Sequence, residues 1–376
     1  MIPVYDRQKL YLDDKDAIDA AVARVLASGR YDWGDEVPAF EVELAAWLGA
    51  KHFVATGSGT AALKAAFRAL RIGPGAEVIT VANTDMANST AIHAVGARAV
   101  WVDIDPLTRC MDPASCAAAI TPRTAAILPV DMYGHPCDIR AFRQLADRHG
   151  LTLIEDACLA LGAEIAGQRV GSFADITCFS FSSGKHLGAL GNAGGCATED
   201  GELARRLRLV SGDGQDRARH RMQPRPLALH YEEESHNDRM DEIQAAVLRA
   251  KLPSLDRTLA QRRAQAARYS QALAGLVQVP AEQPGVRHAW RNYVVETEER
   301  EALARHLNVQ GVQCNALYSP PMHLQPAYEH LDVKCGELPK TEASADRLLG
   351  LPIGPHLQMA EIDVVVAAMR QWNGAD

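Results

Sequence analysis

The 376-residue sequence lacks an excess of positive charge, with 39 lysines and arginines against 47 aspartates and glutamates and a net charge of −8. Proteins that bind nucleic acid without sequence preference neutralise many phosphates with basic residues, so this balance argues against a general nucleic-acid surface. The chain also lacks a basic start followed by an apolar core, and charged residues interrupt every long apolar stretch. We therefore expect neither a signal peptide nor a membrane span.

Metal-binding patterns are missing as well. The eight cysteines show no C-x-x-C spacing, and the 13 histidines show neither H-x-x-x-H spacing nor a nearby cysteine pair. The sequence therefore predicts no metal site. Several cysteines lie inside apolar, strand-like runs, which predicts buried thiols in a reducing compartment such as the cytoplasm.

What the chain does contain is an alternation of strand-like and helix-like segments. Helix-like segments such as 141–149 alternate with strand-like runs at 77–82, 98–103, 125–130, 151–155 and 176–181. This alternation predicts an α/β fold with a mostly parallel central sheet and helices on both faces. Because the length suggests two domains, we predict a large domain over 1–250 and a smaller C-terminal α+β domain over 251–376. A long helical stretch over 240–273, interrupted near Pro253, is expected to leave the large domain.

One lysine follows an apolar run at the point where the run breaks into glycines. Lys185 ends the segment Phe-Ser-Phe-Ser-Ser-Gly-Lys and precedes a second glycine-rich turn. An amine among apolar residues loses hydration, and because burial disfavours the charged form, its pKa falls toward the range where it attacks a carbonyl. Lys185 is therefore a candidate Schiff-base lysine. Taken alone, the segment fits a solvated loop lysine equally well.

A carboxylate stands at the end of another strand-like run. Residues 151–156 form an apolar segment that ends in Glu155 and Asp156. Open α/β sheets bind ligands at the carboxyl ends of their strands, so Asp156 is a candidate partner for a pyridinium nitrogen, whose pKa a carboxylate raises. The alternative is that Asp156 only caps the following helix.

A cradle for an anion is indicated by Thr-Gly-Ser-Gly-Thr at 56–60, followed by apolar residues at helical spacing. The first N–H groups of a helix have no intrahelical partners and favour an anion by up to ~2 kcal/mol. An ordinary helix capped by Ser58 or Thr60 fits the same residues. The segment lacks the lysine of a nucleotide P-loop and the glycine spacing of a dinucleotide site. Together with a lysine and a carboxylate, such a cradle indicates a site for pyridoxal phosphate.

These segments resemble the DegT/DnrJ/StrS-type family of pyridoxal-phosphate sugar aminotransferases, a branch of the fold-type I aspartate aminotransferase superfamily. The resemblance runs nearly end to end and rests on the motifs at 58–63, 129–134, 155–157, 179–191, 237–246 and 318–328. It implies that Lys185 carries the cofactor as a Schiff base and that Asp156 contacts the pyridine nitrogen. It further implies that the phosphate is held by Gly59, Thr60 and Ser180.

The resemblance also implies partners and substrates. Asn237 matches the asparagine that reaches the cofactor phosphate of the neighbouring subunit, which implies a homodimer with shared active sites. The implied reaction moves an amino group from glutamate, or less often glutamine, to a keto sugar, most closely a nucleotide-linked keto-deoxysugar. Tyr318 and His323 are candidate contacts of a sugar hydroxyl or carboxylate, although simple packing also explains His323. Arg219 lies in an arginine-rich segment, 216–225, that could bind a nucleotide diphosphate or remain a solvated loop.

Five positions depart from the family pattern. Leu159 stands where relatives carry a glutamine near the phenolic oxygen of the cofactor, and Leu161 stands where a histidine is common. Asp85 replaces an aromatic ring that stacks on the cofactor, so its carboxylate either faces the ring or turns away. Asp131 and Arg291 each replace a histidine. The pocket is therefore unusual for the family, as expected of an atypical substrate or of a weakly active member.

Three alternatives remain open. The acceptor could be a cyclitol or another carbocyclic ketone rather than a sugar. A pyridoxamine-dependent sugar dehydratase is a different reaction class; its relatives carry a histidine in place of the lysine, and here Lys185 is kept while His186 follows it. The third alternative is a non-catalytic regulatory homologue without cofactor.

Overall fold

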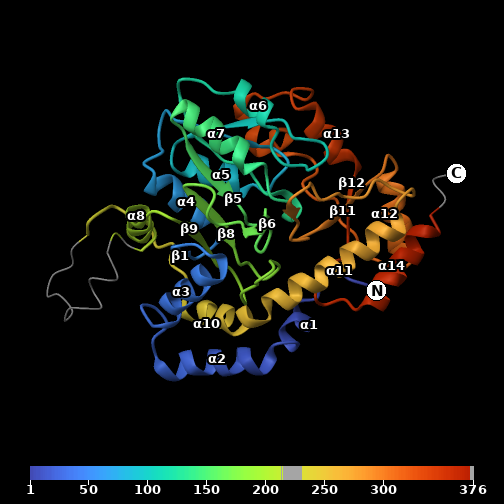
Figure 1. Ribbon diagram of the computed structural model, residues 1–376, viewed down its shortest axis with the longest axis horizontal. Coiled ribbons are helices and arrows are strands. Elements are labelled where there is room, and N and C mark those ends of the chain that lie inside the picture. The colour runs from blue at the N-terminus through green and yellow to red at the C-terminus, as the bar shows by residue number, and fades with distance from the viewer. Residues whose placement is uncertain (213, 215–230, 373–376) are drawn as a thin grey trace.

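A seven-stranded sheet forms the centre of the computed structural model, which describes residues 1–212, 214 and 231–372 (Figure 1). Its strand order is β1-β9-β8-β5-β4-β2-β3. The bounds are His52–Thr56 for β1, Glu77–Val81 for β2, Arg98–Val102 for β3, Thr124–Ile127 for β4, Thr152–Asp156 for β5, Ile176–Ser180 for β8 and Gly194–Thr198 for β9. Of these seven strands, only β9 pairs antiparallel with its neighbours, β1 and β8. The mostly parallel sheet predicted from the sequence is therefore confirmed.

Burial on both faces explains why five of these strands were predicted as apolar runs; β1 and β9 were not predicted. All five residues of β2 are buried, and successive side chains point to opposite faces, so Val78 joins one apolar core and Ile79 another. The predicted strand at 125–130 is shorter than expected, since β4 ends at Ile127. Beyond it, Leu128 N donates to Ile79 O of β2 (2.8 Å), and Val130 forms a single bridge to Asp156 of β5.

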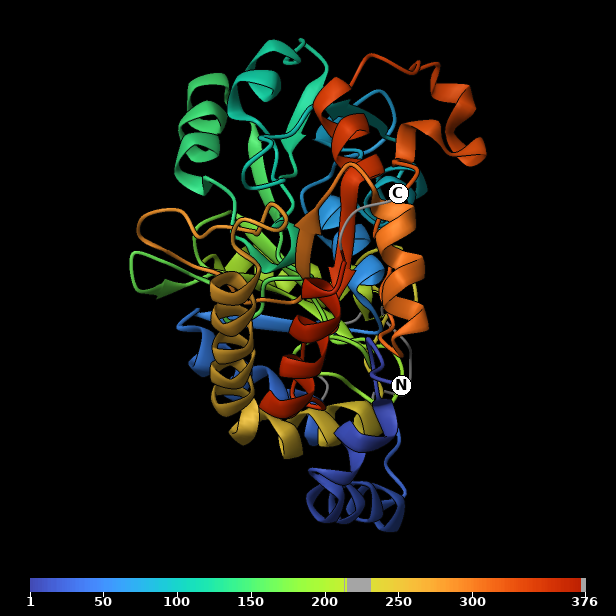
Figure 2. The same cartoon turned by 90° about the vertical axis from the view of Figure 1, so that its right-hand side faces the viewer.

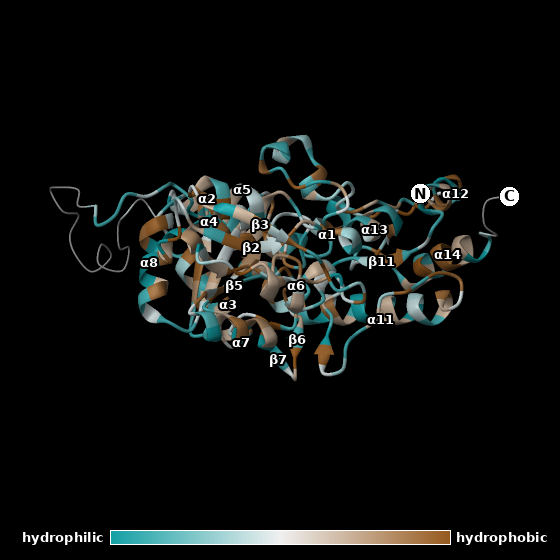
Figure 3. Ribbon diagram, turned by 90° about the horizontal axis from the view of Figure 1, so that it is seen from above, coloured by the Kyte–Doolittle hydropathy of each residue, from teal (hydrophilic) through white to brown (hydrophobic). Residues whose placement is uncertain are grey.

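Helices cover both faces of the sheet (Figure 1). One face packs against α4 (Gly59–Ala69), α5 (Ala87–Ala94) and α8 (Gly201–Ser211), and the other against α3 (Glu36–Leu48), α6 (Pro113–Ala118), α7 (Ile139–His149) and α10 (Glu242–Lys251). In α7 the buried residues Ile139, Phe142, Leu145 and Ala146 recur at helical spacing. Figure 3 shows the resulting division of α7 and α8 into a hydrophobic and a hydrophilic side. The N-terminal helices α1 (Arg7–Leu12) and α2 (Lys15–Ser28) lie at one end, where α2 packs on α10.

The C-terminal part has a core of its own. The interruption predicted near Pro253 is present as a short 3₁₀ turn, Leu252–Ser254, between α10 and α11 (Leu255–Leu273). In Figure 2, α11 and α14 (Met359–Arg370) run side by side, next to the antiparallel pair β11 (Tyr293–Glu296) and β12 (Leu348–Leu351). A separate apolar cluster joins these elements with α12 (Arg300–Val309). The division of the chain at residue 250 stays a prediction.

The remaining elements are short connections. They are β6 (Glu164–Ile165), β7 (Gln168–Arg169), β10 (Val286–Arg287), α13 (Pro339–Arg347) and the 3₁₀ turns η1 (Met132–Gly134), η3 (Met322–Leu324) and η4 (Pro326–Leu331). Among the helices formed by residues 1–212, 214 and 231–372, none combines the length and the apolarity that crossing a bilayer requires.

The cysteines follow the sequence prediction only in part. Five thiols are buried, at positions 110, 116, 137, 178 and 196, whereas Cys158 and Cys314 are half-buried. Cys335 is exposed, because it lies in the loop before α13 and not in a strand.

Candidate active site

The predicted site residues gather at one edge of the sheet. Strands β1, β5 and β8 run in the same direction, so Thr56, Asp156 and Ser180 all stand at the carboxyl ends of their strands. The backbone of Asp156 is fixed there by two hydrogen bonds, donated by its N–H to Pro129 O (2.9 Å) and accepted by its carbonyl from Asp131 N (3.0 Å). This is the edge at which open α/β sheets bind ligands.

The start of α4 provides the anion cradle. Ser58 caps the helix by accepting a hydrogen bond from Ala61 N (3.0 Å), so Ser58, and not Thr60, is the capping residue. The N–H groups of Gly59 and Thr60 belong to the first turn, where no intrahelical acceptor is available. A Cβ on Gly59 would lie only 2.8 Å from Cβ of Ser180 and 3.1 Å from Sγ of Cys158. Glycine therefore lets the helix start approach Ser180 closely, and a small anion can meet both groups.

Lys185 and Asp156 both lie near Cys158. Asp156 is 4% exposed, and its Oδ1 accepts a hydrogen bond from Cys158 N (3.0 Å). Burial, followed by the charge of Asp156, raises the pKa of the Cys158 thiol, and the charge of Lys185 opposes this shift. Both charges are therefore close to Cys158. Within the described part of the chain, Lys185 Nζ forms no hydrogen bond or ion pair.

The local setting of Lys185 differs from the one expected. We expected an amine among apolar strand residues, but β8 ends at Ser180, and Lys185 is half-buried in the turn that follows. Its backbone N–H donates to Ser182 O (2.8 Å), which closes that turn. The glycine-rich segment thus places the lysine beyond the strand end, toward the ligand edge.

The neighbouring acid, Glu155, faces the other side of the sheet, because side chains alternate along a strand. It is fully buried and accepts a hydrogen bond from Thr177 Oγ1 (3.0 Å). Burial, with a smaller contribution from the charge of Asp156, raises the pKa of Glu155 to about 7. His186, the residue after the lysine, is bonded to Ala289 O (3.0 Å), and burial holds its pKa well below the usual range. His186 therefore serves the packing of its loop.

Tyr318 reaches the site from the C-terminal part. Its ring lies 5.9 Å from that of Tyr133. Burial raises the pKa of Tyr318, the charge of Arg291 lowers it, and the charges of Asp85 and Asp156 raise it further, so all three groups lie near its phenol. Asp85 itself is exposed, and its Oδ1 accepts from Ala87 N (3.0 Å) at the start of α5.

Three further residues were predicted to belong to the site. His323 is buried and pairs through Nε2 with Glu342 Oε1 (3.0 Å), which favours the packing explanation. Asn237 is exposed and bridges to Gly212, and the next residue, Asp238, accepts a hydrogen bond through its carbonyl from Gly57 N (2.7 Å) in the cradle segment. Arg219 lies outside the described residues.

Two site residues had no role in the sequence analysis. Tyr5 donates a hydrogen bond from its hydroxyl to Gly184 O (2.6 Å), and Arg291 places its guanidinium carbon 4.7 Å from the centre of the Tyr5 ring. Arg291 was visible only as a departure from the family pattern. No local signal marks Tyr5, because its partner is 179 residues away.

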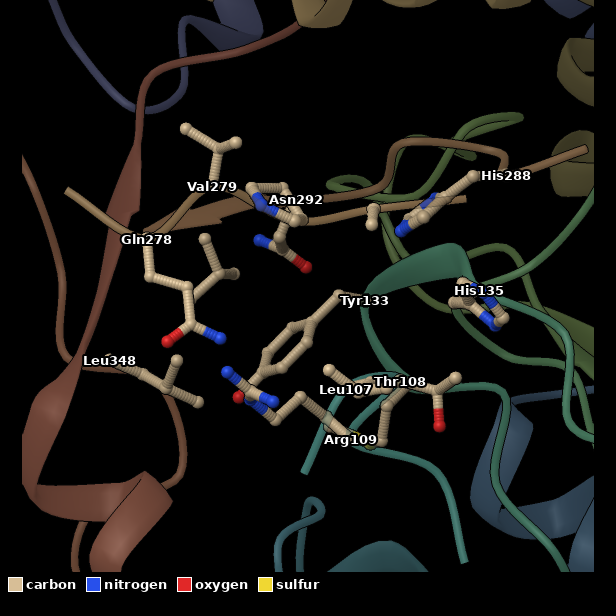
Figure 4. Close-up of a pocket in the computed structure, with 14 residues that line it drawn as sticks. Leu107, Thr108, Arg109, Tyr133, His135, Gln278, Val279, His288, Asn292 and Leu348 are labelled. Atoms are coloured by element: carbon tan, nitrogen blue, oxygen red, sulfur yellow. The ribbon is translucent and has the colours of Figure 1, made fainter. Parts of the chain in front are cut away.

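A separate cavity of about 60 Å³ lies beside Tyr133, and none of the predicted site residues lines it. Figure 4 shows the Arg109 guanidinium, the Tyr133 ring and the amides of Gln278 and Asn292 converging on it. Arg109 already pairs with Glu296. The space suits a few ordered waters between polar groups.

Comparison with known proteins assigns this chain to a family. The DegT/DnrJ/EryC1/StrS aminotransferase family model matches residues 12–370. A dTDP-3-amino-3,4,6-trideoxy-alpha-D-glucose transaminase from Streptomyces venezuelae is 42% identical over 373 residues, which cover 99% of this chain and 96% of that protein. The erythromycin biosynthesis sensory transduction protein EryC1 of Saccharopolyspora erythraea is 43% identical over 371 residues, 98% of this chain and 99% of that one.

The fold also closely matches that of a solved structure. The crystal structure of S. venezuelae DesV, in complex with a ketimine intermediate, superposes with a TM-score of 0.94 at 41% identity, over 100% of this chain and 99% of that one. The chain therefore belongs to the DegT/DnrJ/EryC1/StrS family and is a pyridoxal-phosphate-dependent aminotransferase.

Proposed function

We propose that this enzyme transfers an amino group from glutamate, or glutamine, to a keto sugar linked to a nucleotide. The names of its relatives support this acceptor class, since the S. venezuelae protein is a dTDP-aminodeoxysugar transaminase. The observation that carries the proposal is a gathering of three groups at one sheet edge. They are a lysine without a partner among the described residues, a buried carboxylate and a free helix start.

The residues at this edge fit pyridoxal phosphate. The contact between Gly59 and Ser180, which any Cβ on Gly59 would disturb, leaves backbone N–H groups and a hydroxyl for a phosphate. Asp156 offers a carboxylate to a pyridine nitrogen, and Lys185 offers an amine to an aldehyde. When bound, the cofactor supplies an electron sink for the negative charge that develops when an amino acid loses its α-proton.

Each side chain then has a defined task. Lys185 Nζ would hold the cofactor covalently between turnovers and, once free, would take the proton from the α-carbon of the donor. Asp156 keeps a proton on the pyridine nitrogen through its carboxylate. Gly59, Thr60 and Ser180 hold the phosphate and so fix the position of the reacting carbon relative to Nζ.

We further propose a cytoplasmic homodimer in which Asn237 completes the phosphate site of the other subunit. The exposure of Asn237 supports this role, because a side chain that reaches a partner must stand at the surface of its own subunit. The five buried thiols suit a reducing compartment.

The covalent assignment is tested by fixing the cofactor with borohydride. Lys185→Ala should abolish the fixed adduct while leaving the fold intact, as circular dichroism would verify. The matched control is Lys251→Ala, which removes another half-buried lysine, whose Nζ donates to Gly188 O (2.6 Å) and whose pKa burial lowers. An adduct that persists in the first variant, or disappears in the second, contradicts the role of Lys185.

The acceptor is tested by mass spectrometry of the two half-reactions. The enzyme should accept the amino group from glutamate and deliver it to dTDP- or UDP-linked keto sugars, but not to free carbocyclic ketones. Delivery to a cyclitol ketone would instead support the carbocyclic alternative. A protein that shows no cofactor absorbance after incubation with pyridoxal phosphate would support the regulatory alternative.

A further inference from the structure

Two thiols from different loops meet beside the central sheet. Cys110 lies in the loop after β3, where its carbonyl accepts a hydrogen bond from Asp105 N (2.9 Å). Cys137 lies between η1 and α7, where its N–H donates to Asp131 Oδ1 (2.8 Å). Each thiol acts on the pKa of the other through a direct hydrogen bond, so the two side chains are in contact. Because hydrogen bonds hold both backbones, this contact is built into the fold.

An imidazole with one free nitrogen stands next to the pair. The carbonyl of His135 accepts a hydrogen bond from Cys110 Sγ (3.4 Å). His135 Nδ1 is 2.8 Å from Pro136 O, and because a carbonyl only accepts, Nδ1 carries the hydrogen of the neutral ring. Nε2 then holds a lone pair, and although His135 is only 4% exposed, Nε2 has no hydrogen-bond partner among the described residues. It can therefore take the proton of a thiol.

The surroundings favour a thiolate at Cys110 and a neutral thiol at Cys137. Burial raises the pKa of Cys110, but hydrogen bonds with Cys137 and His135 outweigh burial and lower this pKa to about 5. Burial lowers the pKa of His135, and the contact with Cys110 outweighs burial and raises it. Burial and the contact with Cys110 both raise the pKa of Cys137. A thiolate beside a neutral thiol is the arrangement of an attacking and a resolving cysteine.

A cavity connects the pair with the surface. It has a volume of about 430 Å³, is lined by Cys110, His135 and Cys137, and reaches the exposed residues Asp138 and Arg140. The two cysteines are themselves only 2% and 3% exposed, so the cavity is their route to solvent. Hydrogen peroxide is little larger than a water molecule, whose share of liquid volume is about 30 Å³, and therefore fits this space.

We infer that Cys110 and Cys137 form a redox-active pair that a hydroperoxide converts into a disulfide. The Cys110 sulfur attacks one peroxide oxygen, the O–O bond breaks, and the departing oxygen takes the proton that His135 held, which leaves a sulfenic acid. The Cys137 sulfur then attacks the Cys110 sulfur, the S–O bond breaks, and water leaves with the thiol proton of Cys137. The two thiols lose two electrons in total, and the peroxide gains them.

The pair is also tied to the ligand edge of the sheet. Cys137 N is bonded to the Asp131 carboxylate, and Asp131 N donates to Asp156 O (3.0 Å). Asp156 is the proposed partner of the pyridine nitrogen. A disulfide joins the loop of Cys110 covalently to this chain of hydrogen bonds. Oxidation should therefore weaken the binding of pyridoxal phosphate.

Other thiols of the chain provide internal comparisons. Cys335 is exposed, but its thiol donates to Glu342 Oε2 (3.3 Å), and this hydrogen bond raises its pKa. The sulfurs of Cys178 and Cys196 are 4.0 Å apart, but both residues are fully buried in β8 and β9, and burial raises the pKa of Cys178. If exposure alone decided the reaction, Cys335 would react first. If proximity alone decided it, the pair in the sheet would do so.

The test is peptide mapping by mass spectrometry after the cofactor-loaded enzyme has met an equimolar amount of hydrogen peroxide. A disulfide between Cys110 and Cys137 should form before any change at Cys335 or any bond between Cys178 and Cys196. In Cys137→Ser, dimedone should trap a sulfenic acid at Cys110. His135→Gln should slow the oxidation of Cys110 at least about tenfold, because it removes the group that passes the proton to the departing oxygen. Oxidation that begins at another cysteine while Cys110 and Cys137 stay reduced overturns the inference.

Absorbance titration with pyridoxal phosphate tests the connection to Asp156. Peroxide should raise the dissociation constant of the cofactor at least about twofold in the unchanged protein, as weakening of one hydrogen bond would, and should leave it unchanged in Cys110→Ser. The matched control, Cys335→Ser, should respond as the unchanged protein does. If Cys110→Ser fails to fold, Cys137→Ser takes its place, because neither variant can close the disulfide. A constant that shifts equally in all these proteins, or in none, contradicts the connection.

Discussion

Replacing Gly59 by alanine tests the anion cradle directly. Gly59 is the first residue of α4 and is buried against β8. The added Cβ would meet Ser180 Cβ at 2.8 Å and Cys158 Sγ at 3.1 Å. The Ser180 contact is with an atom fixed to the strand backbone, so rotation of a side chain does not relieve it. The helix start must therefore move away from Ser180 by several tenths of an ångström.

The expected magnitude follows from two opposing effects. Alanine is a better helix former than glycine by about 1 kcal/mol. Overpacking a close contact costs about 1–3 kcal/mol, so the free energy of unfolding should fall by roughly 0–2 kcal/mol. The displacement also lengthens the hydrogen bonds from the helix start to the phosphate. Since such bonds to charged groups contribute about 1.5–3 kcal/mol, the dissociation constant of pyridoxal phosphate should rise at least about tenfold.

The chain offers a matched control in Gly201, the first residue of α8. A Cβ there would meet only His52 Nε2 at 3.5 Å, an ordinary contact. Gly201→Ala should therefore raise the free energy of unfolding by up to about 1 kcal/mol and leave cofactor binding unchanged. Urea unfolding of the two cofactor-free variants and absorbance titration with pyridoxal phosphate measure both quantities. If Gly59→Ala behaves like Gly201→Ala in both assays, the close approach at Ser180 has no role in holding the cofactor.

Two further predictions concern the shared site and the buried acid. Asn237→Ala should speed the loss of cofactor from the dimer during gel filtration, whereas His236→Ala, at the exposed neighbouring position, should not; equal retention in both would contradict a shared site. For Glu155, the folded-state pKa of about 7 lies above the usual 4.5, so folding favours its protonated form and stability falls as pH rises between these values. Glu155→Gln should remove this dependence, a relative gain of up to roughly 3 kcal/mol by pH 8 in urea unfolding, and parallel pH profiles would refute it.

The sequence predicted the features that depend on short segments. Strands buried on both faces appear as apolar runs, so five of the seven strands of the central sheet and the acid at the end of β5 were legible, whereas β1 and β9 were not predicted. Features that depend on distant partners were not. Tyr5 meets Gly184 across 179 residues, and His323 finds Glu342 through a loop whose path no local pattern specifies. The early end of β4 has the same origin, because β5 pairs with it only at Ala126 and Ile127.

Four of the five departures from the family pattern are satisfied by their surroundings in the fold, and one is not. Leu159 and Leu161 are buried in apolar clusters, where a leucine needs no polar partner. Asp85 accepts a hydrogen bond at the start of α5, and Asp131 accepts one from Cys137 N (2.8 Å), while burial and the charge of Glu155 raise its pKa and so favour the neutral form. Arg291 alone of these five keeps a buried charge without an acid among the described residues. A residue satisfied by its own surroundings changes the shape of a pocket, whereas an unsatisfied charge demands a ligand. The chemical preference of this enzyme should therefore differ from that of its relatives first at Arg291.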